Sequence, residues 1–249
     1  MTVLADSPAD EVLWRRVDWM RAGTAVLLDA CGQLDDTDPG RPSALSGWTR
    51  GHVLAHLAQN ATALLNLLSW ARTGVITPMY ASPQARAGDI EAGATLTMPA
   101  LLSGLRVTAA KLDQAVTTLP AQAWPATITT ASGREAPASI VPWMRVREVW
   151  VHAIDLDLGL GFSDIPDDIG RALIDDMAAL MSPRVDGPAF AVRPGAAAGA
   201  AAAPIVVGAG LPSREIAGST ADLTAWLSGR ATPAALGDPA ALPTLPAWL

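Results

Sequence analysis

The chain has 249 residues, of which half are apolar and 16% are charged, and its net charge is −7. This composition can build a sizeable hydrophobic core, and it argues against disorder and against non-specific binding to nucleic acid or to an anionic membrane. The only cysteine, Cys31, excludes an internal disulfide and a cluster of thiolate zinc ligands. No signal peptide and no membrane span is predicted, so we expect a cytoplasmic protein, and a monomer is compatible with the sequence.

Apolar periodicity predicts four substantial helices in the N-terminal part of the chain. Their expected ranges are 8–31, 50–73, 97–120 and 141–161. Ser7 and Thr49 suit the N-cap positions of the first two helices, and Pro142 suits the first turn of the fourth. A short helix over 83–92, and a short hairpin or an irregular excursion over 124–139, are expected in the connections. The sequence therefore predicts a bundle of four helices.

The character of the sequence changes after Gly161. One more amphipathic helix is expected over 164–182, followed by three short β-rich pieces and a last helix over 219–230. The β-rich pieces are 189–192, 204–207 and 214–216. We therefore expect an α+β fold with two domains, an N-terminal four-helix bundle over residues 1–162 and a small C-terminal α/β domain over residues 163–249.

The three histidines of the chain fall into matched spacings on two predicted helices. His52 and His56 stand four residues apart in the second helix, and Glu148 and His152 stand four residues apart in the fourth. Four residues are about one helical turn, or roughly 6 Å of rise, so each pair leaves one face of its helix. Imidazole and carboxylate groups are ordinary zinc ligands, and helical bundles build metal sites from such pairs. The spacing alone leaves open whether His52 or His56 is the third ligand of a catalytic zinc.

A plainer interpretation of the same residues also stays open. In it, the two histidines of the second helix are polar members of one helical face, and Glu148 pairs with Arg145 or Arg147. The two interpretations differ in what lies beside Glu148. In the metal site it is two histidines, and in the plainer interpretation it is an arginine.

Other side chains near these positions have structural and functional interpretations. Asp155 lies three residues beyond His152 and can either accept a hydrogen bond from its ring or be a solvated acid near a helix end. Cys31 is interpreted as a small apolar residue at the end of the first helix rather than as a nucleophile. Trp143 and Trp150 of the fourth helix are expected to pack in the core.

Four stretches, spread over nearly the whole chain, carry a family resemblance. They are GWTRGHVLAHLAQNA, TPMYASPQAR, MRVREVWVHAIDL and a late LSGR, and the chain then ends in a Pro-rich segment with Trp-Leu. In these stretches the sequence resembles the mycothiol-dependent maleylpyruvate isomerases of actinobacteria, which belong to the DinB-like metal-binding superfamily. The alanine tract over 195–203 is the part that we do not expect to align.

The resemblance implies both a fold and a site. It implies an N-terminal DinB-like four-helix bundle, a C-terminal α/β domain and an active site between them. The zinc ligands of the family correspond to His56, Glu148 and His152. His52 matches an additional histidine of closer relatives that is expected to line the pocket, and Arg230 matches a functionally important arginine of the C-terminal domain.

The resemblance also implies a reaction and its cofactors. Maleylpyruvate has a cis double bond conjugated to a carbonyl group, and mycothiol supplies a thiolate that adds to it. The resulting single bond rotates freely, and elimination of the thiolate leaves the trans product, fumarylpyruvate, a step of gentisate degradation. The expected cofactors are zinc, which lowers the pKa of a bound thiol, and mycothiol itself. Arg230 would orient the dianionic substrate or stabilise the charge of the enolate.

Two other functions stay open on the sequence. A mycothiol S-transferase that acts on electrophiles would use the same scaffold, metal and thiolate, and it would differ in its substrate pocket. A non-catalytic binding module is the weaker alternative, because the chain retains the full set of histidines and glutamate.

Overall fold

The computed structural model of the protein describes residues 8–195 and 203–248. The chain is mostly helical with two small sheets, which confirms the expected α+β class. It forms two compact units, Met1–Leu160 (unit 1) and Gly161–Leu249 (unit 2). The N-cap expected at Ser7 and most of the alanine tract lie outside the described residues. Among the described helices, none is long and apolar enough to cross a membrane.

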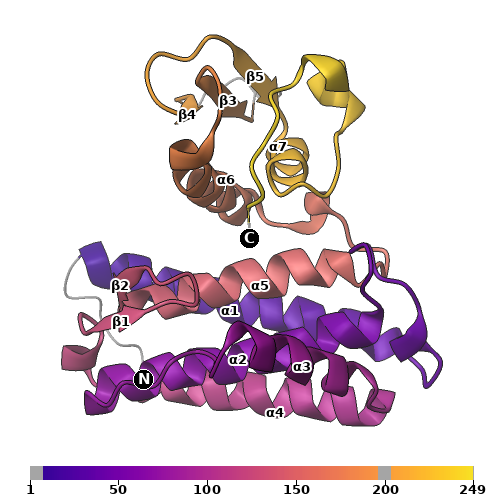
Figure 1. Ribbon diagram of the computed structural model, residues 1–249, viewed down its shortest axis with the longest axis vertical. Coiled ribbons are helices and arrows are strands. Elements are labelled where there is room, and N and C mark those ends of the chain that lie inside the picture. Colours follow the sequence, from indigo (N-terminus) through magenta and orange to yellow (C-terminus); the bar gives the residue numbers. More distant parts are fainter. Residues whose placement is uncertain (1–7, 196–202, 249) are drawn as a thin grey trace. The chain divides into compact units, whose positions relative to one another are not determined.

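Helices make up most of unit 1 and lie alongside one another (Figure 1). The long ones are α1 (Pro8–Ala30), α2 (Arg50–Thr73), α4 (Met98–Thr117) and α5 (Val141–Asp155). α1 packs mainly on α5, α2 packs on both α4 and α5, and α1 touches α4 only sparingly. The shorter α3 (Pro83–Ala94) packs on α2. Apolar side chains fill the space between the helices, and Val17, Leu64 and Val149 have no exposed surface.

A hairpin connects α4 to α5. Its strands, β1 (Thr127–Thr129) and β2 (Glu135–Pro137), pair antiparallel with Ile128 opposite Ala136. Gly133 takes a φ of +81° in the turn, a conformation that glycine adopts at no steric cost. The β-rich and turn residues of the sequence therefore predict this hairpin correctly.

The two ends of α2 follow from single residues. At its start, the Thr49 hydroxyl accepts a hydrogen bond from the backbone N–H of His52 at 3.4 Å, and the backbone N–H of Thr49 donates to His52 Nδ1 at 3.2 Å. This reciprocal pair is a capping box in which histidine takes the place of the usual glutamate or glutamine. At its end, Gly74 has a φ of +74° and closes the helix. Both ends agree with the predicted range.

α5 is shorter than the sequence predicts, because it ends at Asp155 and not at the glycines that follow. The guanidinium of Arg50 donates to the carbonyl of Leu156 at 2.9 Å and to that of Asp157 at 2.7 Å. Asp157 then takes a left-handed conformation, with a φ of +54°. The predicted end is wrong because Arg50 of α2 occupies the carbonyls of Leu156 and Asp157. If the helix continued, these carbonyls would accept hydrogen bonds from backbone N–H groups of the next turn.

Unit 2 combines two helices with a three-stranded sheet. Its elements are α6 (Asp167–Met181), β3 (Phe190–Pro194), β4 (Ile205–Val207), β5 (Glu215–Gly218) and α7 (Thr220–Leu227). The strand order is β4-β3-β5, with β3 antiparallel to β4 and parallel to β5. α6 packs on α7, and the ring of Phe190 in β3 lies 5.7 Å from that of Trp226 in α7. Each strand overlaps one of the three predicted β-rich pieces, with bounds that differ by at most two residues.

α7 also ends before its predicted limit. The helix stops at Leu227, and Gly229 follows with a φ of +73°. The backbone N–H of Arg230 donates back to the carbonyl of Ala225 at 3.0 Å, which closes the helix end. Arg230 therefore lies just after the helix instead of inside it.

Gly23 lets α1 and α5 approach each other closely. A Cβ at this position would lie 2.6 Å from both Trp150 Nε1 and Val149 Cγ2. The indole of Trp150 is held in place because its Nε1 donates to the carbonyl of Trp19 at 3.0 Å. The contact between the two helices therefore depends on the missing side chain at position 23.

We expect Gly23→Ala to destabilise the protein by about 1 kcal/mol or more. Overpacking costs about 1–3 kcal/mol, which exceeds the roughly 0.5–1 kcal/mol gained by removing a helical glycine. The matched control is Gly104→Ala in α4, where a Cβ meets nothing within 4 Å, so the same substitution should stabilise. Urea unfolding of both variants measures the difference, and an equal stabilisation of both would contradict the close contact.

Candidate metal centre

Three side chains from two helices of unit 1 bring their ligand atoms together. His56 comes from α2, whereas Glu148 and His152 come from α5, and one ligand atom of each lies within 4.8 Å of the others. His56 Nε2 is 2.8 Å from Glu148 Oε2, and His152 Nε2 is 3.3 Å from the same oxygen. We call this set the His-Glu-His triad.

Helical spacing and the packing of α2 on α5 place the triad. Glu148 and His152 leave α5 on one face, and His56 meets them from α2 with its ring 4.8 Å from that of His152 and nearly perpendicular to it. The side chain of His56 is 5% exposed, whereas those of Glu148 and His152 are 14% and 13% exposed. The triad is thus largely shielded from water.

Burial and proximity set the protonation of the triad. Burial would raise the pKa of Glu148, but His56 and His152 outweigh it and hold that pKa well below its usual value. Burial lowers the pKa of His56, which favours the neutral imidazole. Burial acts in the same direction on His152, but the hydrogen bonds to Asp155 and Glu148 overcome it and raise the pKa of His152. A charged carboxylate beside a neutral imidazole is the state that binds a divalent cation.

Asp155 fixes the ring of His152. Its side chain has no exposed surface, and its Oδ2 lies 2.8 Å from His152 Nδ1. Because a carboxylate accepts, Nδ1 carries the hydrogen, and Nε2 is left to face Glu148. The solvated acid that the sequence allowed at this position is therefore wrong, and Asp155 instead accepts a hydrogen bond from the His152 ring.

Three residues lie beside His56 that the helical spacing in the sequence does not predict. Arg86 of α3 places Nη2 3.3 Å from His56 Nδ1, and its guanidinium lies over the ring of Tyr80, 5.6 Å from the centroid. The indole of Trp48 packs edge-on against His56 at 5.6 Å. No periodicity links these residues to His56, because they come from loops and a separate helix. They do lie in two of the stretches that carry the family resemblance, GWTRGHVLAHLAQNA and TPMYASPQAR, and this resemblance could have predicted them.

His52 lies outside the triad. Its Nδ1 is 2.7 Å from the Thr49 hydroxyl, and its Nε2 is 3.3 Å from Glu91 Oε2. Its ring stacks on that of Trp48, with 6.1 Å between centroids. The structure therefore places His56, and not His52, beside Glu148 and His152 of α5.

Arg145 does not take the place of the histidines as the partner of Glu148. Its Nη1 donates to the carbonyl of Leu57 at 2.8 Å and to Asn60 Oδ1 at 2.9 Å. Both Arg145 and Arg147 are buried. Of the two arginines that the plainer arrangement offered to Glu148, Arg145 is therefore excluded as its hydrogen-bond partner.

The donor set fits a divalent ion such as zinc. Two imidazole nitrogens and a carboxylate oxygen are common zinc ligands, and tetrahedral donors at about 2.0–2.1 Å from one ion lie roughly 3.3 Å apart. The spacings of 2.8 and 3.3 Å in the triad are close to this value. Three protein donors leave one position for a further ligand, which is typical of catalytic zinc sites.

Cys31 and Arg230 lie elsewhere in the sequence and in different environments. Cys31, at the end of α1, is fully buried, and burial raises the pKa of its thiol to about 12. It is therefore a neutral thiol at physiological pH, in agreement with the structural interpretation. Arg230 belongs to unit 2, where it is partly buried and its Nη1 donates to the carbonyl of Ser228 at 2.8 Å.

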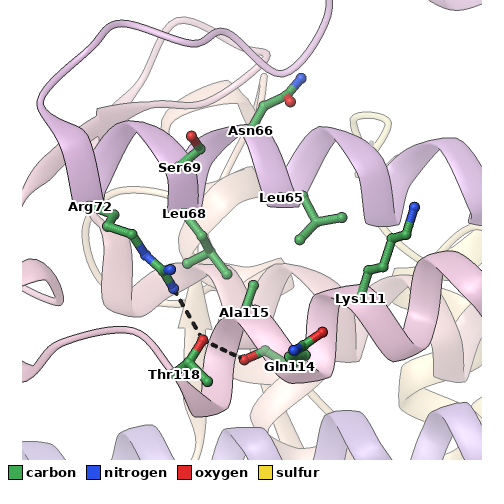
Figure 2. Close-up of a pocket in the computed structure, with 9 residues that line it drawn as sticks. All are labelled: Leu65, Asn66, Leu68, Ser69, Arg72, Lys111, Gln114, Ala115 and Thr118. Atoms are coloured by element: carbon green, nitrogen blue, oxygen red, sulfur yellow. Dashed lines mark hydrogen bonds between the residues drawn. The ribbon is translucent and has the colours of Figure 1, made fainter.

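A groove of about 470 Å³ between α2 and α4 contains none of the triad (Figure 2). Within it, Arg72 donates to the Thr118 hydroxyl at 3.2 Å, and Lys111 stands at the opposite end. These three side chains are exposed. The groove gathers no cluster of buried polar groups, so the triad is the better candidate for chemistry.

A family model and two solved structures that match this chain all carry the name of the same family. The model of the mycothiol maleylpyruvate isomerase N-terminal domain matches residues 4–157. Two crystal structures each cover 93% of this chain and 93% of their own, with a TM-score of 0.82. One is the mycothiol-dependent maleylpyruvate isomerase, at 36% identity, and the other is a histidine-to-alanine mutant under the same name, at 35%. No curated protein matches the chain.

We expect Asp155→Asn to lower the affinity for Zn²⁺ by about 10- to 100-fold, because the His152 ring loses its charged hydrogen-bond acceptor. Asp157→Asn is the matched control, since Asp157 is exposed and interacts with Arg50 through its backbone carbonyl. Competition with a chelating dye measures both affinities. Equal affinities in the two variants would contradict the orienting role of Asp155.

Proposed function

The chain belongs to the mycothiol maleylpyruvate isomerase family, and we propose that it is a mycothiol-dependent enzyme that converts maleylpyruvate to fumarylpyruvate. The observation that carries this proposal is the His-Glu-His triad, in a chain 35% and 36% identical to two isomerase structures over 93% of its length. We also propose a cytoplasmic location, because thiols are kept reduced there.

We propose that unit 1 is a DinB-like four-helix bundle and that the domain boundary follows residue 162. The packing of α1, α2, α4 and α5 supports the bundle. The division into compact units after Leu160 supports the boundary. Residues 163–249 would then form the C-terminal α/β domain with the mixed sheet.

Zinc is the metal that we propose for the triad. His56 Nε2, His152 Nε2 and the Glu148 carboxylate would hold it, and the bound ion supplies a Lewis acid that lowers the pKa of a thiol. The low pKa of Glu148 and the neutral form of His56 suit both residues to this task. Asp155 keeps His152 turned so that its Nε2 faces the other ligands.

We propose that the nucleophilic thiol comes from mycothiol and not from the chain. The one cysteine is buried, and its pKa of about 12 leaves almost no thiolate at neutral pH. In the proposed reaction the external thiolate adds to the cis double bond, and the electron pair moves onto the conjugated carbonyl. Rotation and elimination then restore the double bond in the trans geometry and return the thiolate. The reaction consumes no thiol and needs no oxidant.

Arg230 is proposed to bind a carboxylate of the substrate or the enolate charge that develops during addition. A guanidinium stays charged and can hold a carboxylate through two parallel hydrogen bonds. Such local positive charge matters because the chain carries a net charge of −7, which repels a dianion. The closed end of α7 fixes the backbone of Arg230, so its side chain starts from a defined position.

His52 is proposed to line the pocket. Its ring stacks on Trp48, and Trp48 also contacts His56, so His52 can hold the indole beside the triad. Both of its ring nitrogens already face polar partners, Thr49 and Glu91. This arrangement favours a positioning role over proton transfer.

The proposal is tested by the rate of maleylpyruvate isomerisation, with and without mycothiol, on protein of measured metal content. Thiol-dependent turnover with about one zinc per chain is the expected result. Bound zinc without turnover would instead favour a mycothiol S-transferase. The absence of both would overturn the catalytic function.

We expect His56→Ala and Glu148→Ala each to abolish zinc retention and isomerisation, because each removes one of three ligands. His52→Ala is the control, and it should retain zinc, since His52 lies outside the triad. Metal analysis after dialysis and the isomerase assay measure both effects. Full metal content in the two ligand variants would refute the site.

We expect Arg230→Ala to keep its zinc but to lose turnover by about 100-fold or more, as expected when a charge-stabilising group is removed. Arg184→Ala offers a control in unit 2, because its guanidinium is exposed and caps only its own helix through the Leu180 carbonyl. Steady-state kinetics with maleylpyruvate compare the two. Similar rates in both variants would exclude Arg230 from the reaction.

A further inference from the structure

Arg145 is a fully buried guanidinium whose hydrogen bonds are incomplete. Its side chain is only 1% exposed, yet its Nε and Nη2 have no hydrogen-bond partner. Its Nη1 alone is satisfied, by the Leu57 carbonyl and Asn60 Oδ1. Buried polar groups in folded proteins are nearly always paired, so these two nitrogens indicate a missing acceptor.

The charge of Arg145 also lacks a counterion. Burial lowers its pKa to about 10, so it still carries its charge at neutral pH. In the part of the chain that the structure describes, no carboxylate forms an ion pair with it. Glu148, one turn along α5, raises the pKa of Arg145 from a distance, but its Oε2 is shared between His56 and His152. An additional anion is therefore the partner that this site lacks.

A cavity of about 280 Å³ reaches Arg145 from between α1 and α4. These two helices touch each other only sparingly, which leaves a slot between them. Apolar residues form much of its wall, and they include Met20, Ala25, Ala109 and Leu112. Arg145 is the one lining residue that comes from α5.

The rim of the cavity is polar and carries a second positive charge. Arg106 lines it and is exposed. Arg21 and Asp113 also line it and pair with each other at 2.6 Å, so their charges balance. Asp18 lies 3.8 Å from Arg21 and adds a second negative charge nearby, so the exposed guanidinium of Arg106 attracts an approaching anion only locally.

We propose that this cavity binds a small organic monoanion, with its carboxylate on the guanidinium of Arg145 and its apolar body between α1 and α4. Nε and Nη2 lie side by side with almost no accessible surface, so the carboxylate engages this pair once the Arg145 side chain turns toward the cavity that it lines. A cavity of about 150 Å³ is enough for benzene, so 280 Å³ holds a small aromatic or short-chain carboxylate.

This site is separate from the metal centre. No residue of the His-Glu-His triad lines the cavity, and neither Arg86 nor Trp48 does. Binding there is therefore expected to require neither zinc nor mycothiol, although Glu148 acts on the charge of Arg145 from a distance.

The experiment titrates benzoate into the full-length protein by calorimetry, with benzamide as a neutral probe of the same shape. We expect saturable binding of one benzoate per chain and at least tenfold weaker binding of benzamide. Equal affinity for the two probes would overturn the assignment of an anion site, and the absence of saturable benzoate binding would overturn the cavity itself.

Two variants on the cavity wall locate the binding. Ala109→Trp fills the slot at a partly exposed position, so the protein should fold while benzoate affinity falls at least tenfold. Ala22→Trp on the exposed face of α1, outside the lining, should leave the affinity unchanged. Equal affinity in these two variants would contradict the proposal.

Two further variants separate this site from the metal centre. Arg145→Met should remove benzoate binding without adding bulk, and His56→Ala should leave it intact. Loss of binding in His56→Ala together with normal binding in Ala109→Trp would place benzoate at the triad and overturn the proposal.

Discussion

The contact of Glu148 with His56 and His152 is the interaction on which the rest of unit 1 depends. A carboxylate in a largely buried site is costly unless hydrogen bonds satisfy it. Glu148 meets this requirement only if α2 brings His56 to within 2.8 Å of its Oε2. The register between α2 and α5 is therefore fixed by polar contacts, which are this one and the hydrogen bonds of Arg145 to the Leu57 carbonyl and to Asn60. The same contact sets the three donors at spacings that one metal ion can bridge.

A second contact fixes the same pair of helices near the end of α5. Arg50, in the first turn of α2, donates to the carbonyls of Leu156 and Asp157 and pairs with Asp38. The backbone N–H of Ala44 donates to the carbonyl of Asp155 at 2.8 Å. The segment that carries Asp155 is thus held from two sides. This explains how a side chain beside a helix end can orient the His152 ring and stay fully buried.

Positive charge gathers around the triad although the chain as a whole is acidic. Arg86 lies beside His56, and Arg145 precedes Glu148 by three residues. Arg145 also differs from the other arginines named here in being fully buried with two unsatisfied nitrogens. A chemistry that handles a thiolate and a dianion needs such local charge, because the net charge of −7 opposes both. Two N–H groups of Arg145 have no acceptor among the described residues, and we therefore propose that a separate anionic ligand binds to it.

The sequence by itself determined the elements and the candidate ligands. Periodicity and caps predicted the range of α2 from Thr49 and Gly74, because these signals act within a few residues. The spacing of Glu148 and His152 placed both on one face of a helix, which is a property of the helix alone. Tertiary structure decided the rest. It chose His56 over His52, ended α5 at Asp155 through Arg50, and brought Arg86 to the site. Each of these depends on the packing of one helix against another, and no local pattern records the partner that lies a hundred residues away.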